Sequence, residues 1–151
     1  MEKVKVFFTA VVSAAFSFLG ILAVPVFLLV SCNLIDYFTG LAAAKYRDED
    51  ISSYKGIRGI IKKVCMWLLI LVGWIIDQLI AYASATVGLS LNLPFIVATV
   101  VAVWLICNEI ISILENMIDI GADIPPFLMP LVKRIKSQAE DQAQVDASKE
   151  G

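Results

Sequence analysis

Long apolar segments with almost no charge dominate this sequence and limit the folds open to it. The first apolar run extends from Val4 to Ala44, and within it residues 6–44 contain a single charged residue, Asp36. Two further runs occupy residues 64–84 and 95–118. An apolar segment of about 18 or more residues is typical of a membrane-spanning helix. The sequence therefore predicts an all-α integral membrane protein.

The composition agrees with this fold class. The chain is 60% hydrophobic and 17% charged, whereas a soluble domain is about half apolar and about a quarter charged. As one helix, the first run would measure about 60 Å, roughly twice the hydrocarbon thickness. Gly20 and Pro25 are the natural break points. We therefore predict one transmembrane domain, residues 1–136, with spans at about 4–19, 24–44, 64–84 and 95–118.

The C-terminal part is expected to lie outside the membrane. Gly121 and Pro125–Pro126 should end the fourth span. A short interfacial helix is expected to follow, with apolar residues between Phe127 and Ile135 on one side and basic residues on the other. Residues 137–151 are polar and are predicted to form a disordered tail.

The basic residues predict an orientation. All twelve Lys and Arg residues fall near the N-terminus, in residues 45–63, or after residue 132. Four spans place these three segments on one side of the membrane, so the positive-inside rule predicts that both termini are cytoplasmic. The central loop is expected to contact anionic lipid rather than nucleic acid. Its basic residues include Lys55, Arg58, Lys62 and Lys63.

Acids within the predicted spans are the main candidates for a function. Asp36, Asp77 and Glu109 have no basic residue within their own spans. A carboxylate that faces lipid is costly, so these groups should face protein or water, or be protonated. Polar and small residues share helical faces with them. The candidates for a pore lining or an oligomer interface are Asn33, Asp36, Gly40, Asp77, Asn108, Glu109, Ser112, Glu115 and Asn116.

Two interpretations of these polar faces remain open. They could line a pore or form a seam between several copies of the chain. They could equally form interhelical hydrogen bonds within one folded bundle.

Enzyme chemistry is not expected. The chain has no histidine, and its three cysteines, Cys32, Cys65 and Cys107, show neither disulfide nor zinc spacing. There is no nucleophile–base pair, metal cluster or phosphate-binding loop in the sequence. We therefore expect neither a cofactor nor a metal.

Four sequence features occur in a characteristic order. A D-x-x-T-G element falls on Asp36, Thr39 and Gly40. An S-S-x-x-G-x-x-G-x-x-K-K loop falls on Ser52, Ser53, Gly56, Gly59, Lys62 and Lys63. An acid, Asp77, lies near the end of span three. An E-x-x-S-I-L-E-N helix followed by G-x-x-x-P falls on Glu109, Ser112, Ile113, Leu114, Glu115, Asn116, Gly121 and Pro125.

Together these features resemble the bacteriophage-lysis and toxin-secretion holins, over roughly residues 24–135. The first span and the tail carry no such motif. The resemblance implies a protein that accumulates in the bacterial cytoplasmic membrane, forms homo-oligomers and opens lesions at a set time. Such lesions release an endolysin, which leads to host cell lysis, or a toxin. It also implies no enzymatic activity and no cofactor.

Two other functions suit a small membrane protein of this kind. One is a four-helix transporter or proton-coupled channel that uses Asp36 or Glu109 to bind a cation or proton. The other is a membrane protein that anchors a partner through its basic loop or tail.

Overall fold

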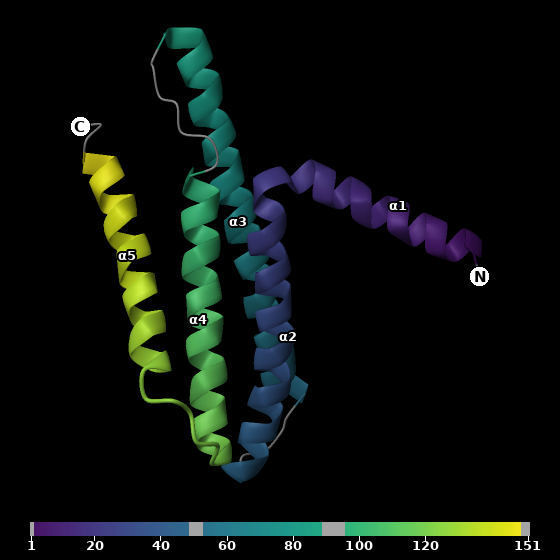
Figure 1. Ribbon diagram of the computed structural model, residues 1–151, viewed down its shortest axis with the longest axis vertical. Coiled ribbons are helices and arrows are strands. Elements are labelled where there is room, and N and C mark those ends of the chain that lie inside the picture. Colours follow the sequence, from purple (N-terminus) through teal and green to yellow (C-terminus); the bar gives the residue numbers. More distant parts are fainter. Residues whose placement is uncertain (1, 49–52, 89–95, 149–151) are drawn as a thin grey trace.

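The computed structural model describes residues 2–48, 53–88 and 96–148, and all regular structure in these residues is helical. The elements are α1 (Glu2–Leu19), the short 3-10 helix η1 (Gly20–Leu22), α2 (Ala23–Tyr46), α3 (Ser53–Val87), α4 (Ile96–Ile120) and α5 (Leu128–Ser148). Helices α2 to α5 run lengthwise through the molecule, and α1 projects sideways from the start of α2 (Figure 1). The predicted all-α class is confirmed.

Three helical segments of the described chain are long and apolar enough to cross a membrane. They are Gly20–Tyr46, Gly56–Val87 and Ile96–Ile120. Helix α1 forms where the first span is predicted, but it is not among these three segments. The chain is thus a membrane protein with three candidate spans, and the fourth crossing stays a prediction.

The break within the first apolar run lies where a glycine permits it. Gly20 has a φ of +52°, a left-handed conformation that costs glycine little because it has no Cβ. Helix α2 starts three residues later, and Pro25 is its third residue. Proline is tolerated in a first helical turn because its missing N–H would have no intrahelical partner there. The predicted division at Gly20 is confirmed.

Helix α3 begins eleven residues earlier than the predicted third span. It contains 35 residues, or about 52 Å at 1.5 Å per residue, which exceeds a hydrocarbon core of about 30 Å. Arg58, Lys62 and Lys63 therefore lie on a helix, and their assignment to a loop is wrong. Lys and Arg are good helix formers, so a membrane helix can continue past the apolar region. The side chain of Lys55 lies outside the part that the structure describes.

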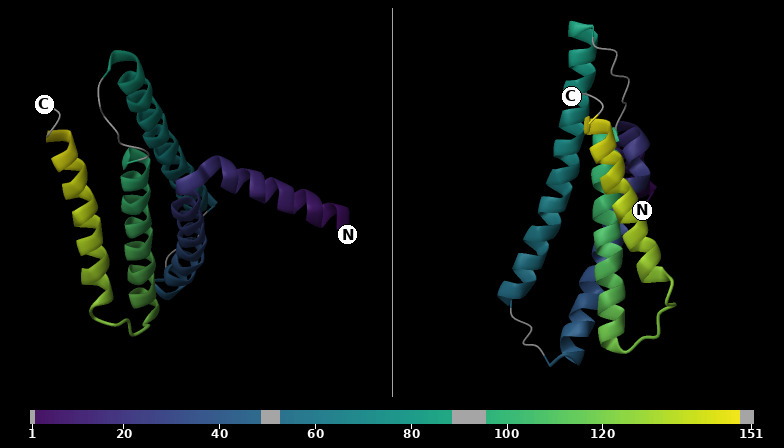
Figure 2. Two further views of the ribbon diagram at one scale, coloured as in Figure 1. Left: turned by 45° about the horizontal axis from the view of Figure 1, so that its top comes forward. Right: turned by 90° about the vertical axis from the view of Figure 1, so that its left-hand side faces the viewer.

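Helix α4 is the centre of the bundle, since α2, α3 and α5 all pack against it. One buried cluster joins α2, α3 and α4 and consists of Leu29, Met66, Ile70, Ala102 and Leu105. Gly73 brings α3 close to the start of α4, because a Cβ at this position would lie 2.9 Å from the Cα of Ala98. Further along, the N-terminal half of α3 diverges from α4 (Figure 2).

The end of α4 follows the prediction, whereas the segment after it does not. The Gly121 N–H donates to the Ile118 carbonyl and the Ala122 N–H to the Met117 carbonyl, both at 2.9 Å. This is the Schellman pattern, which requires the positive φ of Gly121, +91°. Helix α5 then continues to Ser148. This helix is longer than the short helix expected, because it includes residues 137–148, of which Glu140 contacts Trp104 on α4.

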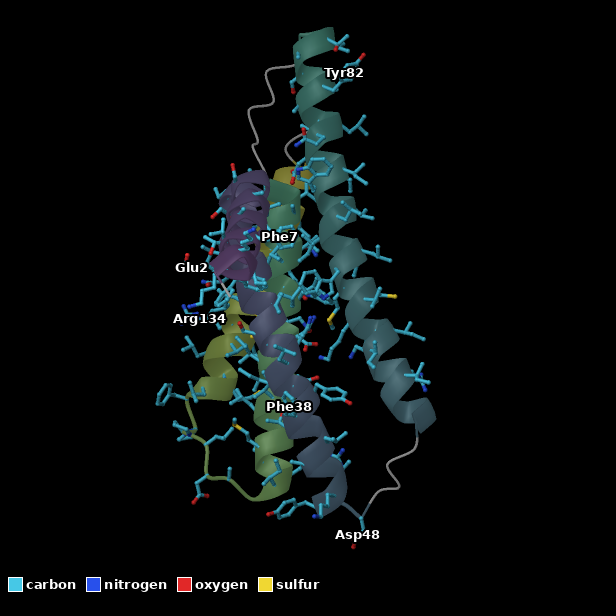
Figure 3. The ribbon with its side chains drawn as sticks, turned by 90° about the vertical axis from the view of Figure 1, so that its right-hand side faces the viewer. Glu2, Phe7, Phe38, Asp48, Tyr82 and Arg134 are labelled. Carbon is cyan, nitrogen blue, oxygen red and sulfur yellow. The ribbon has the colours of Figure 1, made fainter. Side chains whose placement is uncertain are left out.

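Large apolar side chains cover much of the outer surface. On α3 they project away from the bundle up to Tyr82 (Figure 3), which is 69% exposed. Phe38 on α2 is 66% exposed. Exposed apolar surface on this scale would make a water-soluble protein aggregate, whereas lipid chains solvate it.

Candidate functional site

A partly buried lysine links two of the predicted membrane acids. The Nζ of Lys63, on α3, lies 2.8 Å from Oδ2 of Asp36 on α2 and 2.5 Å from Oε2 of Glu109 on α4. The Lys63 and Asp36 side chains are each 17% exposed, and that of Glu109 is 4% exposed. Three helices therefore meet at one ammonium group. The carboxylates lack a basic partner in their own spans and obtain one from α3.

Amide side chains occupy the remaining positions around the two acids. The Nδ2 of Asn116, on α4, donates to Asp36 Oδ1 at 3.1 Å and to Thr39 Oγ1 at 3.2 Å. The Thr39 hydroxyl in turn donates to the Ile35 carbonyl of its own helix at 2.9 Å. Gly40 lies beside this contact, since a Cβ there would be 3.5 Å from Asn116 Nδ2, an ordinary van der Waals distance.

Asn33 completes the polar cluster on the other side of Glu109. Its neighbours assign the amide the orientation in which Nδ2 donates to Glu109 Oε2 at 2.8 Å and Oδ1 accepts from Trp67 Nε1 at 3.2 Å. Among the described residues, no buried side-chain nitrogen or oxygen lacks a hydrogen-bond partner. We call the set Asn33, Asp36, Thr39, Lys63, Trp67, Glu109 and Asn116 the buried polar network, in which Asn33 and Glu109 are buried and Trp67 reaches the surface.

The buried polar network has more acidic than basic groups. Its formal charge with all groups ionised is −1, because two carboxylates share one ammonium. Removing one partner of a buried ion pair leaves an uncompensated charge and costs about 3–5 kcal/mol. In this position the acids join the helices of one copy. This arrangement corresponds to the second interpretation given above, interhelical hydrogen bonding within a single bundle.

Asp77 has a different environment from the other two acids. It is 3% exposed, and its carboxylate accepts hydrogen bonds from the backbone N–H groups of Val97 (3.0 Å) and Ala98 (2.9 Å). These N–H groups belong to the first turn of α4 and have no partner within that helix. A carboxylate from α3 thus caps α4, where the helix dipole also favours a negative charge. Gly73, one turn earlier on α3, allows the close approach.

The polar side of α4 divides into two strips. Glu109 and Asn116 belong to the buried polar network, whereas Asn108, Ser112 and Glu115 line an open groove of about 470 Å³ between α3 and α4. On the α3 side the groove is lined by Lys62, Cys65, Met66 and Leu69. The predicted candidates on α4 are therefore not brought together at one site.

Near the ends of α2 and α4, the side chains of Arg47 and Asp119 form a further ion pair. Sequence reasoning missed Arg47, Asp119 and Trp67, named Thr39 only as part of the D-x-x-T-G element, and placed Lys63 in a loop rather than beside the acids. One signal was available for the lysine, because Lys63 and Trp67 are four residues apart and share a helical face. Arg58 is exposed and lies one turn before Lys62, toward the N-terminal end of α3.

Comparisons with known proteins agree with the sequence motifs. The chain matches the family model described as the bacteriophage holin family over residues 13–137. An uncharacterised protein of Halalkalibacterium halodurans is 33% identical over 137 residues, which cover 90% of this chain and 96% of the relative. An uncharacterised protein of Clostridium perfringens is 31% identical over 114 residues, 76% of each chain.

A phage protein also matches. The protein of Bacillus phage phi105 described as a probable holin is 28% identical over 119 residues, 79% of each chain. No solved structure matches the chain significantly. The order of the motifs and the match over most of the sequence lead to one assignment: this chain belongs to the bacteriophage holin family.

Proposed function

We propose that this protein is a holin that oligomerises in the bacterial cytoplasmic membrane and opens timed lesions there. Through these lesions an endolysin reaches the cell wall, or a toxin leaves the cell. The proposal is carried by the family match over residues 13–137. In this proposal the chain acts by assembly in lipid, without enzymatic chemistry and without direct contact with the released protein.

The geometry supports a subunit that accumulates before it acts. A single copy pairs both Asp36 and Glu109 with Lys63, so each of these two acids has a cationic partner without a second copy. Such a subunit remains folded in lipid at low density, because no buried carboxylate has to find its partner across an interface. Oligomerisation then depends on other surfaces of the bundle.

We further propose that the chain crosses the membrane four times, with both termini in the cytoplasm. The basic ends of α2, α3 and α5 lie at one end of the bundle (Figure 1). Lys3 and Lys5 lie in the first turn of α1, and a crossing by α1 brings them to the same side as the other basic residues. Helix α1 is about 27 Å long, just under the thickness of the hydrocarbon core.

The test is induced expression in a bacterium that also holds an endolysin in its cytoplasm. Culture density, membrane potential and release of a cytoplasmic protein are followed together. A quiet interval followed by abrupt lysis with protein release is the expected result. Expression without the endolysin is the control, and it should release cytoplasmic protein without the fast loss of culture density.

Two other results would contradict the large-lesion holin. Loss of membrane potential without protein release would indicate a channel or transporter, in which Asp36 or Glu109 carries a proton. Normal growth with an intact potential would leave the anchoring of a partner as the better function.

A further inference from the structure

Helix α5 packs lengthwise against α4, the central candidate span. Val132 of α5 belongs to one buried cluster with Cys107 and Leu114 of α4. Trp104 Nε1 donates to Glu140 Oε1 at 2.7 Å, and Lys136 Nζ lies 4.9 Å from the centre of the Trp104 ring. Figures 1 and 2 show α5 running antiparallel alongside α4.

The outer face of α5 is incompatible with lipid. Its exposed side chains include the charged residues Lys133, Arg134 and Asp141, whereas Lys136 and Glu140 turn toward α4 and contact Trp104. Trp104 is the ninth of the 25 residues of α4, so when α5 lies against α4 the exposed charges on either side of this contact, Arg134 and Asp141, lie within the depth of the bilayer. Charges at this depth are costly unless they face protein or water. The docked helix therefore requires water along its outer face.

The other polar groups of α4 do not offer such a face. Glu109 and Asn116 are engaged in the buried polar network, and Asn108, Ser112 and Glu115 line the groove beside α3. The side of α4 beneath α5 is apolar and includes Val103, Ile110 and Leu114. A water-filled lesion that met α4 on this side would expose apolar surface unless α5 covered it.

We propose that α5 forms the water-facing wall of the open lesion and lies against α4 only in that state. In a subunit surrounded by lipid, α5 leaves α4 and lies on the cytoplasmic membrane surface. Its apolar residues then face the acyl chains, and Lys133 and Arg134 face anionic headgroups. This inference rests on the proposed holin function. It assigns the wall of the lesion to one helix of the chain, α5.

The connection between the two helices permits both positions. Residues 121–127 join α4 to α5, and Gly121 there has a φ of +91°. At this connection the Leu128 N–H donates to the Pro125 carbonyl at 3.1 Å and the Leu131 N–H to the Phe127 carbonyl at 3.0 Å, while Ile124 packs on the cluster that joins the two helices. The segment therefore allows α5 to turn away without unfolding α4. In the undocked position the apolar side of α4 is solvated by lipid, as the outer surfaces of α2 and α3 are.

Site-specific cross-linking distinguishes the two positions. Val132→Cys introduces a thiol into the cluster that contains the native Cys107, in a chain in which Cys32 and Cys65 are replaced by alanine. Arg134→Cys is the matched control, since Arg134 lies on the outer side of α5 (Figure 3). Copper–phenanthroline, a membrane-permeant oxidant that removes two electrons and two protons as it joins two neighbouring thiols in one disulfide, is added to expressing cells at intervals before and during lysis. Denatured samples then react with maleimide-PEG, which counts the thiols that remain free in each monomer.

In Val132→Cys, we expect the fraction of monomers with no free thiol, in which positions 107 and 132 are cross-linked, to rise several-fold as lysis begins. In Arg134→Cys this fraction should stay at background. Timely lysis without a cross-link at position 132 would overturn the inference and leave the holin function intact. A cross-link equally strong long before lysis would overturn it as well, because α5 would then be docked in lipid. If Val132→Cys fails to lyse cells, Met129→Cys replaces it, because Met129 packs on the same cluster. Absence of lysis by the unmodified chain would instead reject the proposed function and, with it, this inference.

Discussion

Lys63 Nζ lies 2.5 Å from Glu109 Oε2, across 46 residues of sequence, and this contact ties α3 to the centre of the bundle. The same ammonium also binds Asp36 on α2. One cation therefore compensates acids from two candidate spans. This relationship explains how the chain keeps carboxylates in apolar segments, and the first two predictions below rest on it.

Replacing Lys63 should be the most damaging single change in the network. Lys63→Met leaves Asp36 and Glu109 buried without a cation, and we expect a loss of about 3–5 kcal/mol of unfolding free energy. Lys62→Met is the matched control, because Lys62 is exposed and surface changes usually stay within about 0.5 kcal/mol. Unfolding in detergent, followed by circular dichroism, measures both. Equal stability of the two variants would show that the network contributes little.

The two acids should be strongly non-additive. Asp36→Asn or Glu109→Gln alone leaves one carboxylate for Lys63, so each should cost about 1 kcal/mol. The double variant leaves an unpaired buried ammonium and should lose about 3–5 kcal/mol, more than the sum of the single effects. A double-mutant cycle with the same unfolding assay gives the coupling.

The timing of lysis should follow these stabilities. We expect each single variant of the acids to change the onset of lysis, because less stable subunits accumulate less reliably in the membrane. If Asp36→Asn and Glu109→Gln both lyse cells on the normal schedule, neither acid matters for assembly or for lining a pore.

Asp77 should behave as a helix cap. Asp77→Ala removes the acceptor for two N–H groups at the start of α4 and should cost about 1–2 kcal/mol. Asp77→Asn keeps one acceptor oxygen and should cost less. Gln78→Ala, at an exposed neighbouring position, serves as the control. Hydrogen exchange of the Val97 and Ala98 amides should accelerate in Asp77→Ala, and unchanged exchange would contradict the capping role.

Two glycines on α3 should respond in opposite directions to the same change. In Gly73→Ala the new methyl group would lie 2.9 Å from the Ala98 backbone, and overpacking of this kind costs about 1–3 kcal/mol. Gly59→Ala meets no atom within 4 Å and should gain about 0.5–1 kcal/mol from better helix propensity. The two melting temperatures in one detergent provide the comparison. A stabilised Gly73→Ala would mean that α3 and α4 are further apart in the membrane.

The four-span topology predicts that Lys3 and Lys133 lie on the same side of the membrane. Single cysteines at these positions, in a chain whose native cysteines are replaced by alanine, are treated with a membrane-impermeant maleimide. We expect both to react in inverted vesicles and neither in right-side-out vesicles before lesions open. Reaction of the two cysteines from opposite sides would instead support three spans, with α1 on the outer surface.

Local chemistry accounts for the parts of the fold that could be predicted. The breaks at Gly20 and Gly121 depend on backbone conformations that glycine adopts at little cost. The apolar runs predict helices because a membrane helix satisfies its own backbone hydrogen bonds. The requirement that Asp36 and Glu109 avoid lipid follows from the cost of a charge there. Each of these conclusions depends on neighbours in sequence, so reading the chain was sufficient for them.

The partners of the polar groups depend on how the helices pack. Lys63 lies 27 residues from Asp36 and 46 from Glu109, and helical periodicity relates only residues on one helix. The same limit hid the capping of α4 by Asp77, because this contact joins residues of two helices. It also hid the length of α5, since a polar segment with little apolar surface becomes helical only where another helix covers that surface. Sequence spacing shows which side chains need a partner in the membrane, whereas helix packing determines which partner each of them has.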